Sequence, residues 1–149
     1  MTKNSDGKVI VKFLIVVFIL LCVFLGPFWY KNYKTLVRPM KQVYYEIEKV
    51  KDVEQVWQSA ELTERRGKGD CKDHVILLLD RLGKDGDYLD FTVVQEKSGG
   101  AYHAVLMGHT IVLDPTFGRM YKMTSYLRRW NIIQVISRGY LKQLTSDTL

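Results

Sequence analysis

The chain has 149 residues, of which 47% are hydrophobic and 26% are charged, and its formal net charge is +6. This length suits one domain with an appendage. Five lysines and one aspartate fall within residues 1–35, so much of the positive charge flanks a hydrophobic segment, where anionic lipid headgroups account for it. The charge balance therefore argues against a nucleic-acid-binding protein, and we expect no nucleic-acid partner.

An apolar segment over residues 9–30 comes first in the chain. From Phe13 to Tyr30 almost every residue is apolar, and about 20 such residues suffice to cross a bilayer. Trp29 and the tyrosine after it suit the membrane interface. The segment predicts a single-pass transmembrane anchor over residues 1–30, with membrane lipid as the partner of residues 9–30.

A cleaved signal peptide is the alternative interpretation of this segment. The basic start fits it, but no small-x-small cleavage site follows, and Phe28-Trp29-Tyr30 stands where one would lie. Cys22 could mark a lipoprotein, but Leu21 before it is too large for that processing site. A retained anchor is therefore the better prediction, and lysines on both of its sides leave its orientation open.

Helical patterns follow the apolar segment. Residues 31–45 are expected to form a connector and the start of the first helix, and residues 46–149 the folded domain. The apolar spacing continues the helical pattern to Ser59. Residues 61–69 are polar with two glycines, and they predict a loop.

A second helix is expected from Asp70 to Gly83. Asp70 can cap the first free amides, and Asp73 suits the first turn. The run Val75–Leu79 is apolar nearly all round, which predicts a central, buried helix.

The rest of the chain predicts β-structure. Alternating patterns indicate strands over residues 88–95, 101–107, 110–114 and 131–137. Helices followed by an antiparallel meander indicate an α+β fold.

The hairpin between the second and third strands brings a histidine and an aspartate together. Gly108-His109 suits a two-residue type II′ loop. This loop would place His103 directly opposite Asp114, with Cβ atoms about 5 Å apart on one face of the sheet. The carboxylate could then form a hydrogen bond with one nitrogen of the imidazole. A one-residue slip in the pairing of the two strands would instead place the two side chains on opposite faces of the sheet.

Cys71 follows Asp70 at the start of the buried helix. The free amides and the partial positive charge of a helix N-terminus favour thiolate over thiol. The backbone N–H of Cys71 also points where an oxyanion would form in acyl transfer. Cys71, His103 and Asp114 therefore have the chemistry of a nucleophile, its base and the group that orients the base.

Structural roles for these three residues, and a zinc site, are the alternatives. Cys71, His74, His103 and His109 could in principle supply ligands, but the chain lacks a second closely spaced pair. We expect no metal site from this set, with His109 in a turn and His74 on the flank of the helix.

Three motifs resemble the transglutaminase-like cysteine protease superfamily, most closely the bacterial transglutaminase-like cysteine proteinases. They are Gly-Asp-Cys-x-Asp at residues 69–73, with Trp57 upstream; His103-Ala104-Val105-Leu106; and Leu113-Asp114-Pro115-Thr116. The resemblance covers roughly residues 50–121. It implies a papain-like or transglutaminase-core fold, in which the Cys starts a central helix packed on an antiparallel sheet.

The resemblance also implies the site. Cys71 would be the nucleophile, His103 the base and Asp114 the orienting group, with Trp57 or Gln58 as a second oxyanion donor. No cofactor is required, although calcium could bind near Asp70 and Asp73, and Lys72 between them weakens that expectation. The family favours an extracytoplasmic, periplasmic location for the catalytic domain.

The sequence as a whole predicts a membrane-anchored cysteine peptidase or amidase. It would act on a protein or peptide through a Cys-His-Asp triad and an acyl-enzyme. Acyl transfer to an amine, as in a transglutaminase, is one alternative. A catalytically inactive binding module on the same fold is the other.

Overall fold

The structure is a computed structural model, and the residues that it describes are 5–50 and 57–146. The chain divides into two compact units, Met1–Lys34 and Thr35–Leu149. The boundaries predicted after residues 30 and 45 stay predictions.

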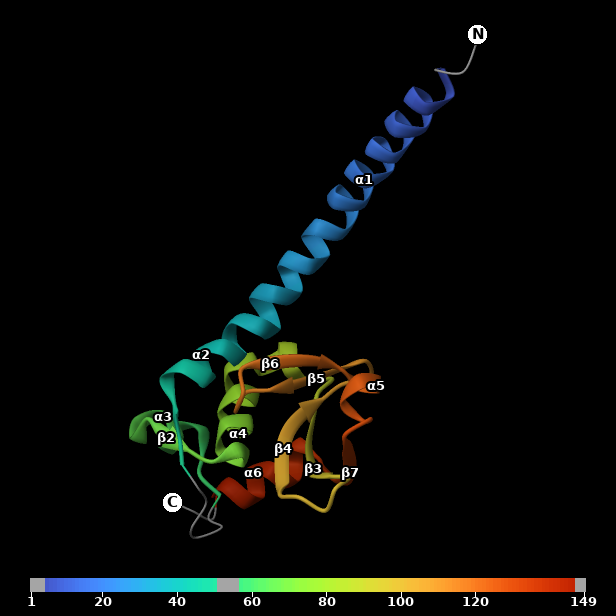
Figure 1. Cartoon of the computed structure of the whole chain (residues 1–149). Helices are drawn as coiled ribbons and strands as arrows, with labels where there is room; N and C mark the ends of the chain where they lie inside the picture. The colour runs from blue at the N-terminus through green and yellow to red at the C-terminus, as the bar shows by residue number, and fades with distance from the viewer. Residues whose placement is uncertain (1–4, 51–56, 147–149) are drawn as a thin grey trace. The chain divides into compact units, whose positions relative to one another are not determined.

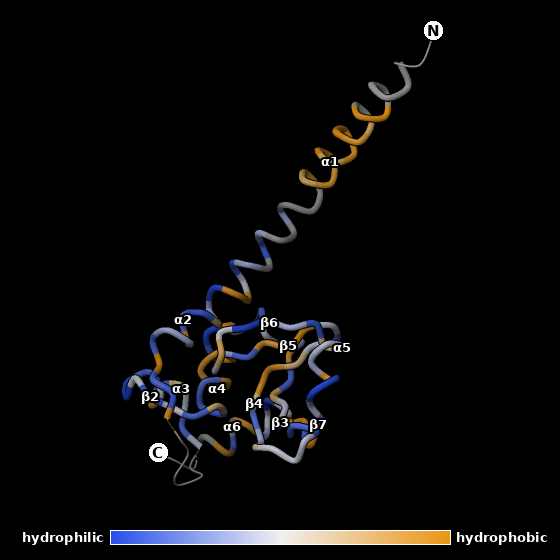
Figure 2. Tube along the Cα trace, in the orientation of Figure 1, coloured by the Kyte–Doolittle hydropathy of each residue, from blue (hydrophilic) through white to orange (hydrophobic). Residues whose placement is uncertain are grey.

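The first unit consists of one long helix. Helix α1 spans Ser5–Asn32 and contains Pro27. The described large apolar side chains between Ile10 and Val23 are exposed, except that of Val17, which is half-buried, and Figure 2 shows apolar residues along the N-terminal part of α1. Among the described residues, no helix is both long enough and apolar enough to cross a membrane. The predicted transmembrane anchor is therefore not supported.

Short helices and two short strands open the second unit. Their bounds are η1 Tyr33–Val37, α2 Arg38–Glu46, β1 Glu48–Lys49, α3 Ala60–Arg66, β2 Lys68–Gly69, α4 Cys71–Leu82 and η2 Gly83–Gly86. The helix predicted to run from residue 40 to residue 59 ends at Glu46, because Ile47 is extended and β1 pairs in parallel with β2. The part of this prediction that covers residues 51–56 lies outside the described residues.

Helix α3 replaces the loop predicted over residues 61–69. The Ser59 side chain caps it by accepting a hydrogen bond from the Leu62 amide, at 3.2 Å. Gly67 ends the helix with φ of 63°, a left-handed conformation that glycine adopts without strain. A polar, exposed helix leaves little apolar periodicity in the sequence, which explains the wrong prediction.

The predicted central helix is confirmed as α4. Asp70 is its N-cap and Gly83 its C-cap, and the run around Val75 and Leu78 is buried. In Figure 1, α4 lies between α2 and α3 on one side and the sheet on the other, and it contacts α2, α3 and β4. Its Arg81 guanidinium also pairs with Glu46 of α2 and Glu64 of α3, at 2.7 and 2.8 Å.

A five-stranded antiparallel sheet forms the rest of the unit, in the order β6-β5-β4-β3-β7. The elements are β3 Asp90–Glu96, β4 Tyr102–Met107, β5 Ile111–Asp114, β6 Arg119–Lys122, α5 Met123–Tyr126, β7 Trp130–Ile136 and α6 Arg138–Ser146. The α+β class and the four predicted strands are confirmed within a residue or two at each end. Strand β6 and helices α5 and α6 were not predicted.

The two faces of the sheet carry two apolar clusters. Ala104 and Leu106 belong to the cluster that includes the buried face of α4. Val105 and Val112 belong to the other cluster, with Tyr126 of α5. Figure 2 shows the apolar character of β4, whose residues supply both faces. Since side chains alternate along a strand, His103 and Asp114 lie on the face of Val105 and Val112.

The register of the β4–β5 hairpin differs from the prediction. Leu106 pairs with Leu113, and the Gly108 amide donates a hydrogen bond to the carbonyl of Ile111 at 2.9 Å. The loop is therefore His109-Thr110, one residue later than predicted. His103 and Asp114 are diagonal rather than direct neighbours, but they still share a face. Moving a two-residue turn by one position shifts the pairing by two residues, which preserves the face of every side chain.

Candidate active site

Cys71 is the first residue of α4 and is half-buried. The side chain of Asp70 accepts hydrogen bonds from the amides of Lys72 and Asp73, at 2.9 and 3.3 Å. The Asp73 carboxylate in turn accepts from the Asp70 amide at 3.1 Å, which completes a capping box. The thiol thus sits on a helix terminus that its two flanking aspartates fix in place.

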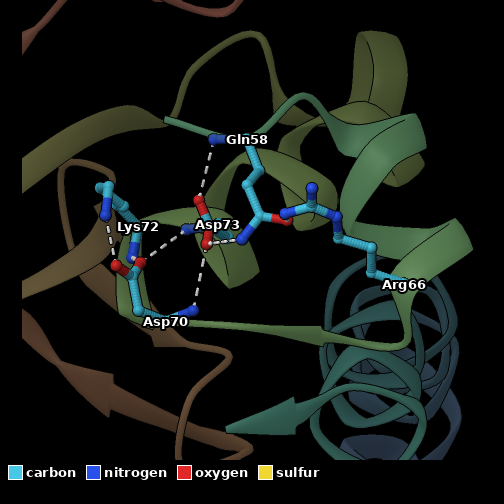
Figure 3. A network of polar contacts seen from close by, with 5 residues as sticks. All are labelled: Gln58, Arg66, Asp70, Lys72 and Asp73. Atoms are coloured by element: carbon cyan, nitrogen blue, oxygen red, sulfur yellow. Dashed lines mark hydrogen bonds and ion pairs between the residues drawn. The ribbon is translucent and has the colours of Figure 1, made fainter. Parts of the chain in front are cut away.

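A wider network holds this terminus against the preceding segment (Figure 3). The Gln58 amide donates to Asp73 Oδ1 at 3.1 Å, and Gln58 Nε2 donates to Asp73 Oδ2 at 2.8 Å. Lys72 Nζ forms an ion pair with Asp70 Oδ2. Burial and then the Asp70 charge raise the pKa of Asp73, against the lowering effects of its backbone hydrogen bonds and of Lys72. The network therefore concentrates two carboxylates directly beside Cys71.

His103 and Asp114 meet on the sheet. His103 Nε2 lies 2.9 Å from Asp114 Oδ2, and both side chains are buried. The second carboxylate oxygen of Asp114 accepts from the Phe117 amide at 3.2 Å, across the turn that follows β5. This turn fixes the carboxylate, and the carboxylate fixes the orientation of the imidazole ring.

His103 also interacts with Cys71. Burial lowers the pKa of His103, but hydrogen bonds with Asp114 and Cys71 and the charges of both residues outweigh it, and the pKa rises to about 9. Because Nε2 faces Asp114, Nδ1 is the nitrogen that remains for the thiol. The structure thus places the His103 ring in contact with the Asp114 carboxylate, and the triad of Cys71, His103 and Asp114 stays a prediction.

Two aromatic rings lie beside this imidazole. The ring centroid of Phe117 is 5.4 Å from that of His103, and the centroid of Trp130 is 5.6 Å away. Tyr126 stacks on Trp130 at 5.7 Å. These three residues were not predicted from the sequence. The spacing Asp114-Pro115-Thr116-Phe117 could have indicated Phe117, since an aspartate often accepts from an amide a few residues later.

The two predicted oxyanion donors, Trp57 and Gln58, both have contacts within the domain. Gln58 donates to Asp73 with both its backbone and its side-chain nitrogen. The Trp57 ring packs on the first apolar cluster, 5.4 Å from Phe91. The assignment of Trp57 or Gln58 as an oxyanion donor stays a prediction.

The other two histidines lie apart from the site chemistry. His74 is buried in α4, and desolvation lowers its pKa to about 4. His109 is exposed in the hairpin loop. Across the described part of the chain, no group of three or more His, Cys, Asp or Glu residues could hold a metal ion.

The carboxylates beside Cys71 do not fit calcium. Asp70 Oδ1 accepts hydrogen bonds from the amides of Lys72 and Asp73, and Asp70 Oδ2 pairs with the Lys72 ammonium group. Both oxygens of Asp73 accept from Gln58, and one also accepts from the Asp70 amide. A calcium ion needs six to eight oxygen ligands, and here the oxygens face nitrogen donors and an ammonium group. The calcium site expected near Asp70 and Asp73 is therefore not supported by these residues.

Comparisons with known proteins give a structural likeness only. No family model matches the sequence, and no curated protein matches it. Calcium-bound LapG of Legionella pneumophila has a TM-score of 0.62 and 16% identity, over 78% of this chain and 80% of LapG. A further LapG structure has a TM-score of 0.62 and 17% identity over 78% and 77% of the two chains. EGTA-treated LapG has a TM-score of 0.56 and 19% identity over 68% and 63%. This likeness shows that the chain shares the fold of the LapG structures.

Proposed function

We propose that this chain is a cysteine peptidase or amidase that acts through a Cys71–His103–Asp114 triad. The observation that carries the proposal is the buried contact between His103 Nε2 and Asp114 Oδ2, together with the influence of Cys71 on the pKa of the same ring. The fold of the LapG structures supports a peptidase-type enzyme at the level of architecture.

The first chemical step follows from this geometry. With a pKa of about 9, His103 is an imidazolium at neutral pH and carries the proton that the leaving group later needs. The nucleophile in this step is the thiolate form of Cys71. The thiolate attacks the carbonyl carbon of an amide, and a C–S bond forms. His103 then donates its proton to the leaving nitrogen as the C–N bond breaks, which leaves an acyl-enzyme.

Hydrolysis of the acyl-enzyme uses the same residues. The neutral imidazole takes a proton from a water molecule, whose oxygen attacks the thioester carbonyl and releases Cys71. Asp114 holds the ring in one orientation through both steps and stabilises its charged form.

The oxyanion donor in this proposal is the backbone N–H of Cys71. Asp70 caps the amides of Lys72 and Asp73, and the His74 amide donates to the Asp70 carbonyl. The first amide of α4 is thus the one left to face a developing negative charge, where the helix dipole adds to its effect.

The test is the reactivity of the thiol towards iodoacetamide at pH 7. A Cys22→Ser background leaves Cys71 as the single thiol. We expect alkylation at least about tenfold faster than that of free cysteine, because thiolate is the nucleophile. His103→Ala should slow it towards the free rate, and Cys71→Ala should abolish it. Labelling no faster than free cysteine would instead favour an inactive binding module.

We also propose a protein or peptide substrate and an extracytoplasmic location for the catalytic domain. The fold that this domain shares with the LapG structures supports the substrate class, and the family resemblance of the motifs around Cys71, His103 and Asp114 supports the location. An alkaline phosphatase fused to the C-terminus, which is active only outside the cytoplasm, should be active in cells. An inactive fusion with normal expression would contradict this location.

A further inference from the structure

A cavity of about 380 Å³ opens against the His103–Asp114 pair. It lies on the face of the sheet that carries the second apolar cluster. Its walls include the rings of Tyr102, Phe117, Tyr126 and Trp130, together with His103 and Asp114. Among the described residues that line it, Cys71 does not occur. The cavity therefore borders the imidazole on a side that the thiol does not occupy.

In the proposed mechanism, the side of His103 that lines the cavity faces the leaving-group half of the substrate. The leaving nitrogen must lie within hydrogen-bond distance of His103, because this ring donates the proton that the nitrogen needs. The acyl half stays bonded to the sulfur of Cys71. The chain beyond the leaving nitrogen consequently runs past His103, towards the cavity that the same ring lines.

The charges at the cavity disfavour a basic occupant. Its two carboxylates already have partners: Glu96 pairs with Arg129 at 2.7 Å, and Asp114 contacts His103 at 2.9 Å. Lys49 Nζ lies 4.7 Å from the centroid of Phe117 and adds positive charge to the wall. Aromatic walls with no carboxylate available for a cation suit a large apolar or aromatic side chain.

We propose that this cavity is the subsite for the residue on the leaving-group side of the scissile amide, and that it selects a large aromatic side chain there. This inference rests on the proposed function. It makes Phe117 and Trp130 specificity-determining residues, which contact the substrate while Cys71 and His103 perform the chemistry.

Competition between amines for an acyl-enzyme tests this subsite. p-Nitrophenyl acetate acetylates Cys71 when the C–S bond forms and p-nitrophenolate leaves. An amine that binds in the subsite then attacks the thioester carbonyl, gives a proton to His103 and releases the thiolate, which is the reverse of leaving-group departure. The amides of phenylalanine, alanine and lysine are offered in turn, and N-acetyl products are quantified against acetate by mass spectrometry.

We expect phenylalanine amide to intercept the acetyl-enzyme at least about tenfold better than alanine amide, because only its ring is buried against the aromatic walls. Phe117→Ala and Trp130→Ala should each reduce this ratio. The side chain of Phe117 is exposed, so we expect the Phe117→Ala variant to fold. Tyr140→Ala, an exposed aromatic residue of α6 outside the cavity, should leave the ratio unchanged.

Two results would overturn the assignment, and they are distinguishable. A burst of p-nitrophenol that requires Cys71, followed by equal interception by phenylalanine and alanine amides or by a preference for lysine amide, refutes the subsite alone. The absence of a burst refutes the proposed function, and the subsite with it. The Cys22→Ser background ensures that any burst comes from Cys71. The Cys71→Ala variant gives the rate of p-nitrophenol release without acylation of this thiol.

Discussion

Asp114 controls the charge of His103, and its replacement should be visible on the imidazole itself. Asp114→Asn keeps the shape but removes the negative charge that raises the pKa of His103 to about 9. An opposite charge at this distance shifts a pKa by about one to three units. We therefore expect the pKa of His103 to fall by at least about one unit, measured by NMR titration of the three histidine rings. An unchanged titration would show that Asp114 does not support the imidazolium.

His74 should make the fold sensitive to mild acid. Its pKa is about 4 in the folded protein and about 6.5 in an unfolded chain. Between these values the unfolded chain binds more protons, so the free energy of unfolding falls as the pH decreases from 6.5 to 4, by about 3 kcal/mol.

Urea unfolding at pH 7 and pH 4.5 measures this loss. His74→Leu removes the titrating group, and neither ring nitrogen has a hydrogen-bond partner among the described residues. The variant should therefore lose much less stability than the wild type over this interval. Equal losses in the two proteins would assign the acid sensitivity to other groups.

The sequence predicted the contact of His103 with Asp114 because that contact depends only on the alternation of side chains. The exact turn was wrong, yet both residues stayed on one face. Phe117 and Trp130 were missed for a different reason. Phe117 reaches the imidazole from the turn after β5, where only the spacing to Asp114 could have indicated it. Trp130 reaches the imidazole from β7, and its position depends on how the sheet is assembled, which no local pattern encodes.

At the scale of elements, the start of α4 depends on a close approach of backbone to side chain. A Cβ atom on Gly69 would lie 2.7 Å from the Cβ atom of Asp73 and 3.2 Å from a methyl group of Thr63. Gly69→Ala should therefore push the capping carboxylate away and destabilise the fold by about 1–3 kcal/mol. The measurement is the midpoint of urea unfolding.

Gly139 of α6 provides the matched control for this substitution. A Cβ atom there meets nothing within 4 Å, and alanine favours a helix over glycine by about 1 kcal/mol. Gly139→Ala should therefore leave the stability unchanged or raise it. A stable Gly69→Ala variant would show that the terminus of α4 adapts without cost.

The ion pair of Lys72 with Asp70 suggests that α4 keeps its terminus without a metal ion. A ligand that binds only the folded state raises the melting temperature as its concentration increases. We expect the same melting temperature in excess EGTA and in millimolar calcium chloride, measured by circular dichroism. A rise that grows with calcium concentration would reveal a site that these residues do not provide.

The helices were predicted with uneven success, and the physical reason is burial. Helix α4 is apolar nearly all round and has a cap at each end, so both its position and its limits followed from the sequence. Helix α3 is mostly exposed, and its sequence carries little apolar periodicity. The expected continuation of α2 failed because residues 48–49 find a strand partner in residues 68–69, a contact between distant segments.

At the scale of the whole molecule, the site belongs to one of the two units. Cys71, His103 and Asp114 all lie within Thr35–Leu149, as do both apolar clusters. A protein limited to residues 35–149 should therefore unfold at the same urea concentration as the full chain and alkylate its thiol at the same rate. Loss of cooperative unfolding in this shorter protein would show that residues 1–34 contribute to the fold.

The β4–β5 hairpin also bears on how this protein can change in evolution. Substitutions at residues 108–110 that move the turn by one position leave the imidazole and the carboxylate on a common face, so selection should tolerate them. Deletion of one residue between Ile111 and Asp114 would turn the carboxylate to the opposite face and remove it from His103. Among descendants of this chain, loop composition should therefore vary freely, while the length of the strand that follows is conserved.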